Sequence, residues 1–345
     1  METKIWTMDD PDFDKLGEAA RILANGGLVA FPTETVYGLG AIFNNESALR
    51  KIFAVKGRPA DNPLIVHIGQ LTQLTELTTK VGSKAERLIA EFWPGPLTLI
   101  FPKRKEVSLV VSAGLDTVAV RMPSHPVAKS LLELTGIPVA APSANLSGRP
   151  SPTRGDHVRQ DLAGKIDAII DGGSCSKGIE STVLSLAGKA PVILRPGSVT
   201  REMIEKVLCE TVEISGTHAG GNDRPLAPGM KYRHYAPQAP VLLIKGENRK
   251  VVAEINRLLA DNPSRKAIVL GSTENVGQYH NEWVLDLGPK AEPEIMATRL
   301  YDLLRFCDQL PVEMIYIEGV EAAGIGVAIA NRIEKAAGGN VIHVS

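Results

Sequence analysis

The chain has 345 residues, which is too long for one small domain and predicts two. Its hydrophobic fraction of 44% and charged fraction of 22% exclude a disordered chain, a collagen-like fibre and a coiled coil. Lys and Arg number 38 against 39 Asp and Glu, so the chain lacks the basic excess that is typical of proteins binding nucleic-acid backbones. An anionic ligand is therefore expected in a local pocket.

The cysteines and the N-terminus bear on the cellular compartment. Cys175, Cys209 and Cys307 are widely spaced and form no C-x-x-C pair, which predicts reduced thiols rather than disulfides or a zinc site. The opening METKIWTMDD lacks the basic and apolar stretches of a signal peptide, and no run of about eighteen apolar residues occurs. We expect a cytoplasmic protein with no membrane contact.

Helical and strand patterns alternate through the first two hundred residues. Apolar residues at helical spacing predict helices over 13–25 and 47–57, and the string LVAF between them predicts a strand ending at Pro32. Further strands are predicted over 63–68, 97–102, 117–123, 138–145, 168–171, 181–186 and 191–197, and a helix after Thr200. Only AGKA separates the last two strands, which should form a hairpin. Residues 1–212 are thus predicted to form an α/β domain around a mixed, twisted sheet.

The remaining chain divides into a linker and a second domain. Residues 213–240 are predicted to be the linker, because seven of the 24 residues in 217–240 are Pro or Gly. The run KYRHY within it is unusual for a passive connection. From residue 241 to 345, fully apolar strands alternate with helices, one of them long and predicted over 292–309. This pattern is typical of a small, parallel, Rossmann-like α/β domain.

Two polar side chains interrupt apolar strands, where an unsatisfied polar group is costly. By strand alternation, Arg121 faces the same way as Thr117 and Ala119, and His67 the same way as Ile65. An arginine keeps its charge at any working pH and needs an anionic partner. A bound anion and an internal ion pair are equally compatible with the sequence.

Hydroxyls, amides and cations also gather where the predicted strands begin or end. Ser143 and Asn145 lie two residues apart after a strand, which suits phosphate or carboxylate binding or an ordinary polar turn. Lys56 and Arg58 lie two apart on a predicted loop and indicate either a phosphate clamp or a solvated charge pair. Further donors stand at Thr33, Thr35, Tyr37, Ser181, Thr182 and Arg195. Together these groups predict one pocket for a polyphosphate beside a small polar molecule.

Other known site patterns are incomplete. GLGAIF (38–43) and GIGVAI (324–329) begin G-x-G but lack the third glycine of a dinucleotide fingerprint, although the second precedes a predicted helix. The sequence has no Walker-type loop, no nucleophile elbow and no tight His, Cys or acidic group for a metal.

Several ordered strings carry a family resemblance. They are PTETVYGLG, KGRP, NPLIVHI, FWPGPLT, VAVRMP, APSANLSG, SPT, STV and LRPGS. In order and spacing they resemble the threonylcarbamoyl-adenylate synthases of the YrdC-type fold, over residues 15–200. The linker string PGMKYRHYAP and the domain after it resemble the longer, two-domain branch of that family.

The resemblance implies a nucleotidyltransferase that joins L-threonine, bicarbonate (or CO2) and ATP to give threonylcarbamoyl-AMP and pyrophosphate. A downstream threonylcarbamoyl-transferase complex would pass the group to the adenosine beside the anticodon of tRNAs that read codons starting with A. Contact with tRNA itself would be weak or indirect, and a monomer is expected. Mg²⁺ would enter with ATP, with no metal ligand from protein side chains.

The same resemblance assigns residues to roles. L-threonine would be bound by Thr35, His67, Arg121, Ala141 and Ser181. ATP would be bound by Arg58, Asn62, Thr117, Ser143, Ser151, Arg195 and Tyr235. The catalytic set would be Lys56, Arg58, Ser143 and Asn145. His67 is a candidate for the base that deprotonates the threonine ammonium group.

Elementary chemistry agrees with a site built of cations and donors. Carboxylated threonine is already an oxyanion, so its attack on the α-phosphorus needs charge neutralisation and alignment more than proton removal. The carbamate is labile in water, which gives the linker a purpose as a lid that excludes solvent, with Tyr235 closing over the site.

Two other functions fit parts of the sequence. An RNA-binding module is suggested by Lys231, Arg233 and the basic run 103–105, although the balanced charge opposes strong nucleic-acid affinity. An O-carbamoyltransferase of similar fold is the second alternative. It would use carbamoyl phosphate and show no dependence on threonine.

Overall fold

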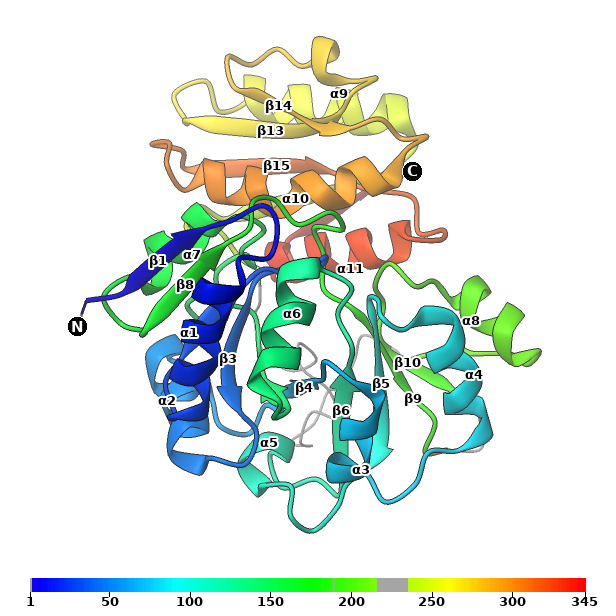
Figure 1. Ribbon diagram of the computed structural model, residues 1–345. Coiled ribbons are helices and arrows are strands. Elements are labelled where there is room, and N and C mark those ends of the chain that lie inside the picture. The colour runs from blue at the N-terminus through cyan, green and yellow to red at the C-terminus, as the bar shows by residue number, and fades with distance from the viewer. Residues whose placement is uncertain (1, 189, 216–234) are drawn as a thin grey trace. The chain divides into compact units, whose positions relative to one another are not determined.

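The computed structural model describes residues 2–188, 190–215 and 235–345, which fall into two compact units (Figure 1). The first unit holds the described residues up to Ser147 and those from Ser151 to 215. The second holds Gly148–Pro150 and the described residues from Tyr235 onward. The predicted linker and lid, residues 213–240, lie mostly outside the described residues.

The first unit is built on a mixed sheet whose described strands follow the order β1-β8-β2-β3-β7-β4-β6-β5-β9-β10-β11. The strands are β1 (Lys4–Thr7), β2 (Val29–Phe31), β3 (Gly38–Ile42), β4 (Ile65–His67), β5 (Leu97–Pro102), β6 (Thr117–Arg121), β7 (Val139–Ala140), β8 (Ala168–Asp171), β9 (Thr182–Ser185), β10 (Val192–Arg195) and β11 (Glu213–Ile214). The predicted hairpin is confirmed, because β9 and β10 pair antiparallel. The prediction of a mixed α/β sheet is likewise confirmed.

Helices cover both faces of this sheet (Figure 1). They are α1 (Phe13–Ala24), α2 (Glu46–Lys56), α3 (Leu74–Leu77), α4 (Ser83–Phe92), α5 (Leu109–Ser112), α6 (Pro126–Thr135), α7 (Gly155–Leu162) and α8 (Arg201–Leu208). The apolar stripe of α1, Leu16 to Leu23, packs with α6 on one face, and α2, α4, α7 and α8 pack on the other. On the first of these faces, β4, β5, β6 and β9 carry only a small separate apolar cluster that includes Ile65 and Ala119.

The register of the central strands positions the site. β4 runs parallel to β6, so that His67 lies beside Arg121 and Ile65 beside Ala119. β7 runs antiparallel to β4, and beyond it the Ala141 amide donates to the Ile65 carbonyl. The carboxyl ends of β4 and β6 therefore meet at one edge, and their amino ends meet about four residues away at the other.

The G-x-G string at residues 38–43 is a strand, β3, rather than a nucleotide loop. A Cβ at Gly40 would lie 2.8 Å from Val139 Cγ1 and 2.9 Å from Phe31 Cε1. Close packing against these two side chains, and not a ligand, accounts for the glycine at this position.

The second unit confirms the predicted small parallel domain. Its strands are β12 (Val241–Gly246), β13 (Ala267–Ser272), β14 (Val284–Gly288), β15 (Met314–Glu318) and β16 (Val341–Val344), all parallel in the order β14-β13-β15-β12-β16. Its helices are α9 (Asn248–Ala260), α10 (Pro293–Cys307) and α11 (Gly326–Ala337). Across the described residues of both units, no helix is long and apolar enough to span a bilayer.

Candidate active site

Arg121 ends β6 at the carboxyl edge of the central strands and is almost completely buried, at 3% exposure. Its guanidinium is held on three sides. Nη2 lies 2.7 Å from Glu34 Oε1, Nη1 donates to Thr35 Oγ1 at 2.8 Å, and Nε donates to the Gly95 carbonyl at 3.2 Å. The sequence left two partners possible for Arg121, a bound anion or an internal carboxylate. The structure shows an internal carboxylate, that of Glu34.

Glu34 was not predicted as a site residue, although it stands between Thr33 and Thr35 in the string PTETVYGLG. Burial alone would raise the pKa of its carboxyl group, but the Arg121 guanidinium outweighs that effect and holds the pKa below its usual value. The carboxylate makes an ion pair with Arg121, while neither of its oxygens has a partner in hydrogen-bonding geometry. The charges of the Arg121–Glu34 pair are therefore fixed in place, while the Glu34 carboxylate can still accept hydrogen bonds.

His67 lies beside Arg121 at the end of β4 and is buried, at 4% exposure. Its Nδ1 is 3.2 Å from the Ile65 carbonyl, and its ring meets Phe31 edge-on at 6.2 Å between centroids. Burial and the nearby Arg121 charge lower the pKa of His67 to about 3. The ring is therefore neutral near pH 7, and its low basicity argues against the predicted role as the base for an ammonium group.

Ser181 and Arg195 extend the same edge across the next strands. Arg195 Nε donates to the Ser181 carbonyl at 3.1 Å and Nη2 donates to Ser181 Oγ at 3.1 Å. Ser181 Oγ is 2.8 Å from Thr98 Oγ1. In the antiparallel register of β5 with β6, Leu99 lies opposite Val120. Thr98 therefore lies opposite Arg121.

Backbone irregularities aim Arg195 at this edge. The register of β10 shifts between Ile193 and Arg195, and such a bulge re-aims the side chain that follows it. Gly197 then brings the chain against the start of β9, where a Cβ would lie 2.3 Å from the Thr182 amide nitrogen. Thr98 was missed by the sequence analysis, although strand alternation in LTLIFP places it opposite Leu97 and Leu99.

A second polar cluster joins Lys56, Ser143 and Asn145. Lys56 Nζ donates to the carbonyl of Ser143, to that of Asn145 at 2.5 Å and to Asn145 Oδ1 at 3.3 Å. Ser143 Oγ donates to Asn145 Oδ1 at 2.5 Å, so the two side chains do point the same way. This one segment supplies Lys56 with as many acceptors as an ammonium group has donors.

The helix predicted over 47–57 is confirmed as α2, so Lys56 does not lie on the loop that was also predicted for the pair Lys56 and Arg58. Lys56 is the last residue of α2, and Gly57, in the left-handed region at φ 61°, ends the helix. Because Lys56 is 3% exposed, the alternative of a solvated charge pair is also wrong for it. The K-x-R spacing places one cation inside the protein and leaves the other, Arg58, half-buried beyond the helix.

Arg58, Asn62 and Thr117 lie toward the amino ends of β4 and β6. Arg58 Nη2 donates to the Pro63 carbonyl at 3.1 Å, just before β4. Asn62 is 1% exposed, yet neither its Nδ2 nor its Oδ1 has a hydrogen-bond partner among the described residues. A buried carboxamide without partners is rare in native proteins and indicates a missing ligand or water. Thr117 begins β6, four residues or about 13 Å from Arg121.

The other predicted residues lie as follows. Ala141 is buried beside Gly38, whose Cβ would be 3.3 Å from that of Ala141. Ser151 is buried and donates to Glu180 Oε1 at 2.6 Å, a carboxylate that the sequence analysis missed. Tyr235 belongs to the second unit, where its ring lies 5.2 Å from that of Tyr301 and 5.5 Å from the Arg332 guanidinium carbon. The part of Tyr235 in ATP binding stays a prediction.

Comparisons with known proteins point to one family. Residues 21–197 match the family described as "Telomere recombination" (Sua5, YciO and YrdC), and residues 199–338 match "Threonylcarbamoyl-AMP synthase, C-terminal domain". The chain belongs to the threonylcarbamoyl-AMP synthase family. The resemblance seen in the sequence is therefore confirmed, including the two-domain branch.

Relatives in this family match along nearly the whole chain. The threonylcarbamoyl-AMP synthase of Bacillus subtilis is 47% identical, covering 99% of this chain and 100% of its own length. That of Pyrococcus abyssi is 48% identical, covering 96% of each. A crystal structure of P. abyssi Sua5 with L-threonine superposes with a TM-score of 0.94 at 47% identity, over 99% of this chain and 100% of that one. Threonylcarbamoyl-AMP synthases are nucleotidyltransferases, and the chain is an enzyme of this class.

Proposed function

We propose that this enzyme makes threonylcarbamoyl-AMP and pyrophosphate from L-threonine, bicarbonate or CO2, and ATP. The observation that carries the proposal is the pair of polar clusters at the two ends of β4 and β6. Because Thr117, Ala119 and Arg121 share one strand face, the two clusters can serve one elongated ligand pair. Adenylation needs such a pair, an amino acid and a nucleoside triphosphate held end to end.

The carboxyl end is proposed to bind L-threonine. Arg121 has five N–H donors and would pair with the threonine carboxylate while Glu34 and Thr35 hold its plane in place. His67, Ala141 and Ser181 would complete this pocket, with His67 as a neutral hydrogen-bonding group. The crystal structure of P. abyssi Sua5 with L-threonine supports a threonine site in a protein of this fold.

The amino end is proposed to bind ATP. Arg58, Asn62, Thr117 and Ser143 would contact the nucleotide, and the unsatisfied Asn62 carboxamide would gain partners from it. Ser151 joins this set through the resemblance. The resemblance also assigns Arg195 to ATP, although Arg195 lies with Ser181 at the carboxyl edge. We assign Lys56 a positioning role, since its ammonium group holds the Ser143–Asn145 segment.

The reaction follows from these positions. The neutral threonine amine forms a carbamate, either with CO2 and release of a proton to solvent or with bicarbonate and release of water. A carbamate oxygen then attacks the α-phosphorus while the bond to the bridging oxygen breaks and pyrophosphate leaves. Arg58, Ser143 and Asn145 would align and neutralise the phosphate charge, which is a preorganised electrostatic contribution. Among the described residues, no three His, Cys, Asp or Glu side chains are placed to hold a metal. We propose that Mg²⁺ enters with ATP and is bound mainly by its phosphates.

The product is a mixed anhydride that reacts readily with nucleophiles. We propose that it serves a downstream threonylcarbamoyl-transferase complex, which modifies the adenosine beside the anticodon of tRNAs reading codons that start with A. The enzyme itself would need little tRNA contact.

Pyrophosphate release with ATP, bicarbonate and each amino acid in turn tests the proposal. We expect release with L-threonine far above that with serine, and a product that contains one carbon from labelled bicarbonate by mass spectrometry. Equal release with all amino acids, or with none, would contradict the proposal.

A further inference from the structure

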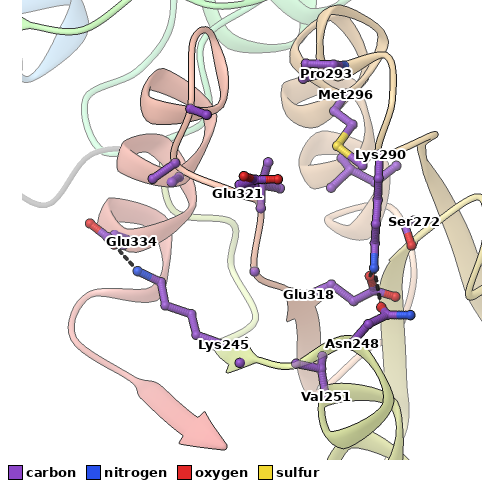
Figure 2. Close-up of a pocket in the computed structure, with 17 residues that line it drawn as sticks. Lys245, Asn248, Val251, Ser272, Lys290, Pro293, Met296, Glu318, Glu321 and Glu334 are labelled. Carbon is purple, nitrogen blue, oxygen red and sulfur yellow. Dashed lines mark hydrogen bonds and ion pairs between the residues drawn. The ribbon is translucent and has the colours of Figure 1, made fainter. Parts of the chain in front are cut away.

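The second unit contains a cavity of about 650 Å³ at the carboxyl ends of its parallel strands (Figure 2). Gly246 ends β12, Ser272 ends β13 and Glu318 ends β15, and all three line it. Pro293 at the start of α10 and the loop 319–323 before α11 complete the wall. This cavity shares no lining residue with the site of the first unit.

Strand order explains why the cavity forms here. From β12 the chain crosses through α9 to β13 on one side, whereas from β15 it crosses through α11 to β16 on the other. Because β12 and β15 are neighbours, their connections leave a crevice between them at the carboxyl ends, which is where open parallel sheets bind ligands. The G-x-G string noted in the sequence begins in the turn after β15 and continues into α11, which starts at Gly326. A Cβ at Gly326 would be 2.0 Å from the Glu321 carbonyl oxygen, so the turn requires this glycine.

Ser272 gives independent evidence of a ligand. It lines the cavity and is 1% exposed, yet its Oγ has no hydrogen-bond partner among the described residues. Leaving a buried hydroxyl unsatisfied costs about 1–3 kcal/mol, so the site is unfavourable unless something binds there.

Glu318 places a carboxylate on the same wall. It is 3% exposed, and its Oε1 accepts a hydrogen bond from the Tyr279 hydroxyl. Lys290 Nζ lies 3.7 Å from its other oxygen, Oε2, and donates to Asn248 (Figure 2). At 3.7 Å this lysine leaves Oε2 able to accept a shorter hydrogen bond from a ligand.

Charge in the cavity narrows the ligand class. Three acidic side chains, Glu318, Glu321 and Glu334, face two lysines, Lys245 and Lys290. Lys245 is already paired with Glu334. An excess of carboxylate disfavours a polyphosphate and favours a neutral ligand that donates hydrogen bonds.

Apolar side chains line another part of the cavity. Leu287 and Met296 lie on β14 and α10, and Val251 lies on α9. Flat, weakly polar rings are bound by such surfaces, and most ligand cavities combine an apolar wall with a few placed polar groups.

We propose that this cavity is a nucleoside site, in which Glu318 and Ser272 bind the ribose hydroxyls and the base lies against Leu287 and Met296. A carboxylate oxygen accepts from a hydroxyl, and the Ser272 hydroxyl can both accept and donate. A nucleoside supplies vicinal donors and an uncharged, flat ring with weakly polar faces, which is the combination that the lining favours. The site is independent of the reaction proposed for the first unit.

Titration calorimetry of the full chain with adenosine tests the proposal, and variants of the second unit assign the binding to this cavity. We expect saturable binding, weakened about tenfold by Ser272→Ala and at least about tenfold by Glu318→Gln. Ser264→Ala and Glu282→Gln, at exposed positions of the same unit, should leave it unchanged. Because the Ser272 hydroxyl has no partner, Ser272→Ala should melt no lower than wild type.

A ligand change gives a test that needs no variant. 2′,3′-Dideoxyadenosine lacks the vicinal 2′- and 3′-hydroxyls and should bind wild-type protein at least about tenfold more weakly than adenosine. The absence of saturable adenosine binding would overturn the proposal. So would equal binding of the two nucleosides, or adenosine affinities in Ser272→Ala and Glu318→Gln that match their controls.

Discussion

Two buried polar side chains, one at each end of β4 and β6, differ in their hydrogen bonding. At the carboxyl end, Arg121 is fixed by Glu34, Thr35 and a carbonyl oxygen before any ligand arrives. At the amino end, Asn62 is just as buried but has no hydrogen-bond partner among the described residues. Arg121 is held in place by the protein, whereas Asn62 would gain its partners from a ligand.

This difference indicates which ligand each end of the two strands is suited to bind. Fixed charge suits a small zwitterion, whose carboxylate must be oriented before the amine can react. Groups that gain partners only on binding suit the larger nucleotide, because their desolvation cost is recovered when ATP is present. The predictions below are arranged to separate the two ends.

The largest effect is expected at the preorganised end. Arg121→Met leaves Glu34 buried and unpaired, which should lower the free energy of unfolding by about 3–5 kcal/mol and abolish threonine-dependent turnover. Adding Glu34→Gln should restore part of the stability but no activity. Urea titration measures the first effect. Arg104→Met breaks an exposed, solvent-screened pair with Glu106 and should cost far less stability than Arg121→Met. Equal losses in the two single variants would contradict the account.

The next prediction concerns the amino end, where Lys56 holds the Ser143–Asn145 segment in place. Lys56→Met removes the donor shared by three acceptors of the Ser143–Asn145 segment, and kcat/KM for ATP should fall about 10–100-fold. Lys51→Met, on the exposed side of the same helix, is the control.

Lys56→Arg distinguishes positioning from charge. The guanidinium keeps the positive charge, but its planar fork does not match three acceptors gathered around one point. We expect no rescue of kcat/KM by Lys56→Arg. Recovery of wild-type activity would show that charge at the phosphates is what matters.

A smaller effect concerns pH. The pKa of His67 in the folded protein is about 3, below its usual value, so between pH 3 and about 6.5 the unfolded chain binds more protons. Acidification through this window should therefore destabilise the protein, by up to about 1.4 kcal/mol per pH unit from this group. His67→Gln should flatten the dependence measured by urea titration from pH 6.5 to 5. His343→Gln, exposed on β16, should leave it unchanged, and a wild-type slope in His67→Gln would refute the assignment.

Much of the fold was predictable from the sequence because its elements follow simple periods. The apolar stripe at Leu16, Ala19, Ala20 and Leu23 gave α1, and the fully apolar strands after residue 240 gave a parallel sheet. β3 was not predicted, because its glycines suggested a loop. In the structure, Gly40 leaves room for the side chains of Phe31 and Val139 on the neighbouring strands. Such contacts are non-local and leave no periodic signal.

The sequence predicted which residues belong to the site better than it predicted which residues they contact. Spacing placed Ser143 and Asn145 on one side, as the structure confirms. Spacing could not show that Lys56 points inward, because that depends on where α2 meets the segment 143–145. Nor could it select Glu34 as the partner of Arg121, since the two lie 87 residues apart and meet only through the sheet.

The most direct test of the two-ended site is a crossed titration of L-threonine and a non-hydrolysable ATP analogue against two variants. Arg121→Lys should weaken threonine binding at least about tenfold and leave the affinity for the analogue within about twofold. Asn62→Leu should do the reverse, weakening the analogue about tenfold and sparing threonine. If both variants weaken the same ligand, or weaken both ligands equally, the division of the site between the two strand ends is wrong.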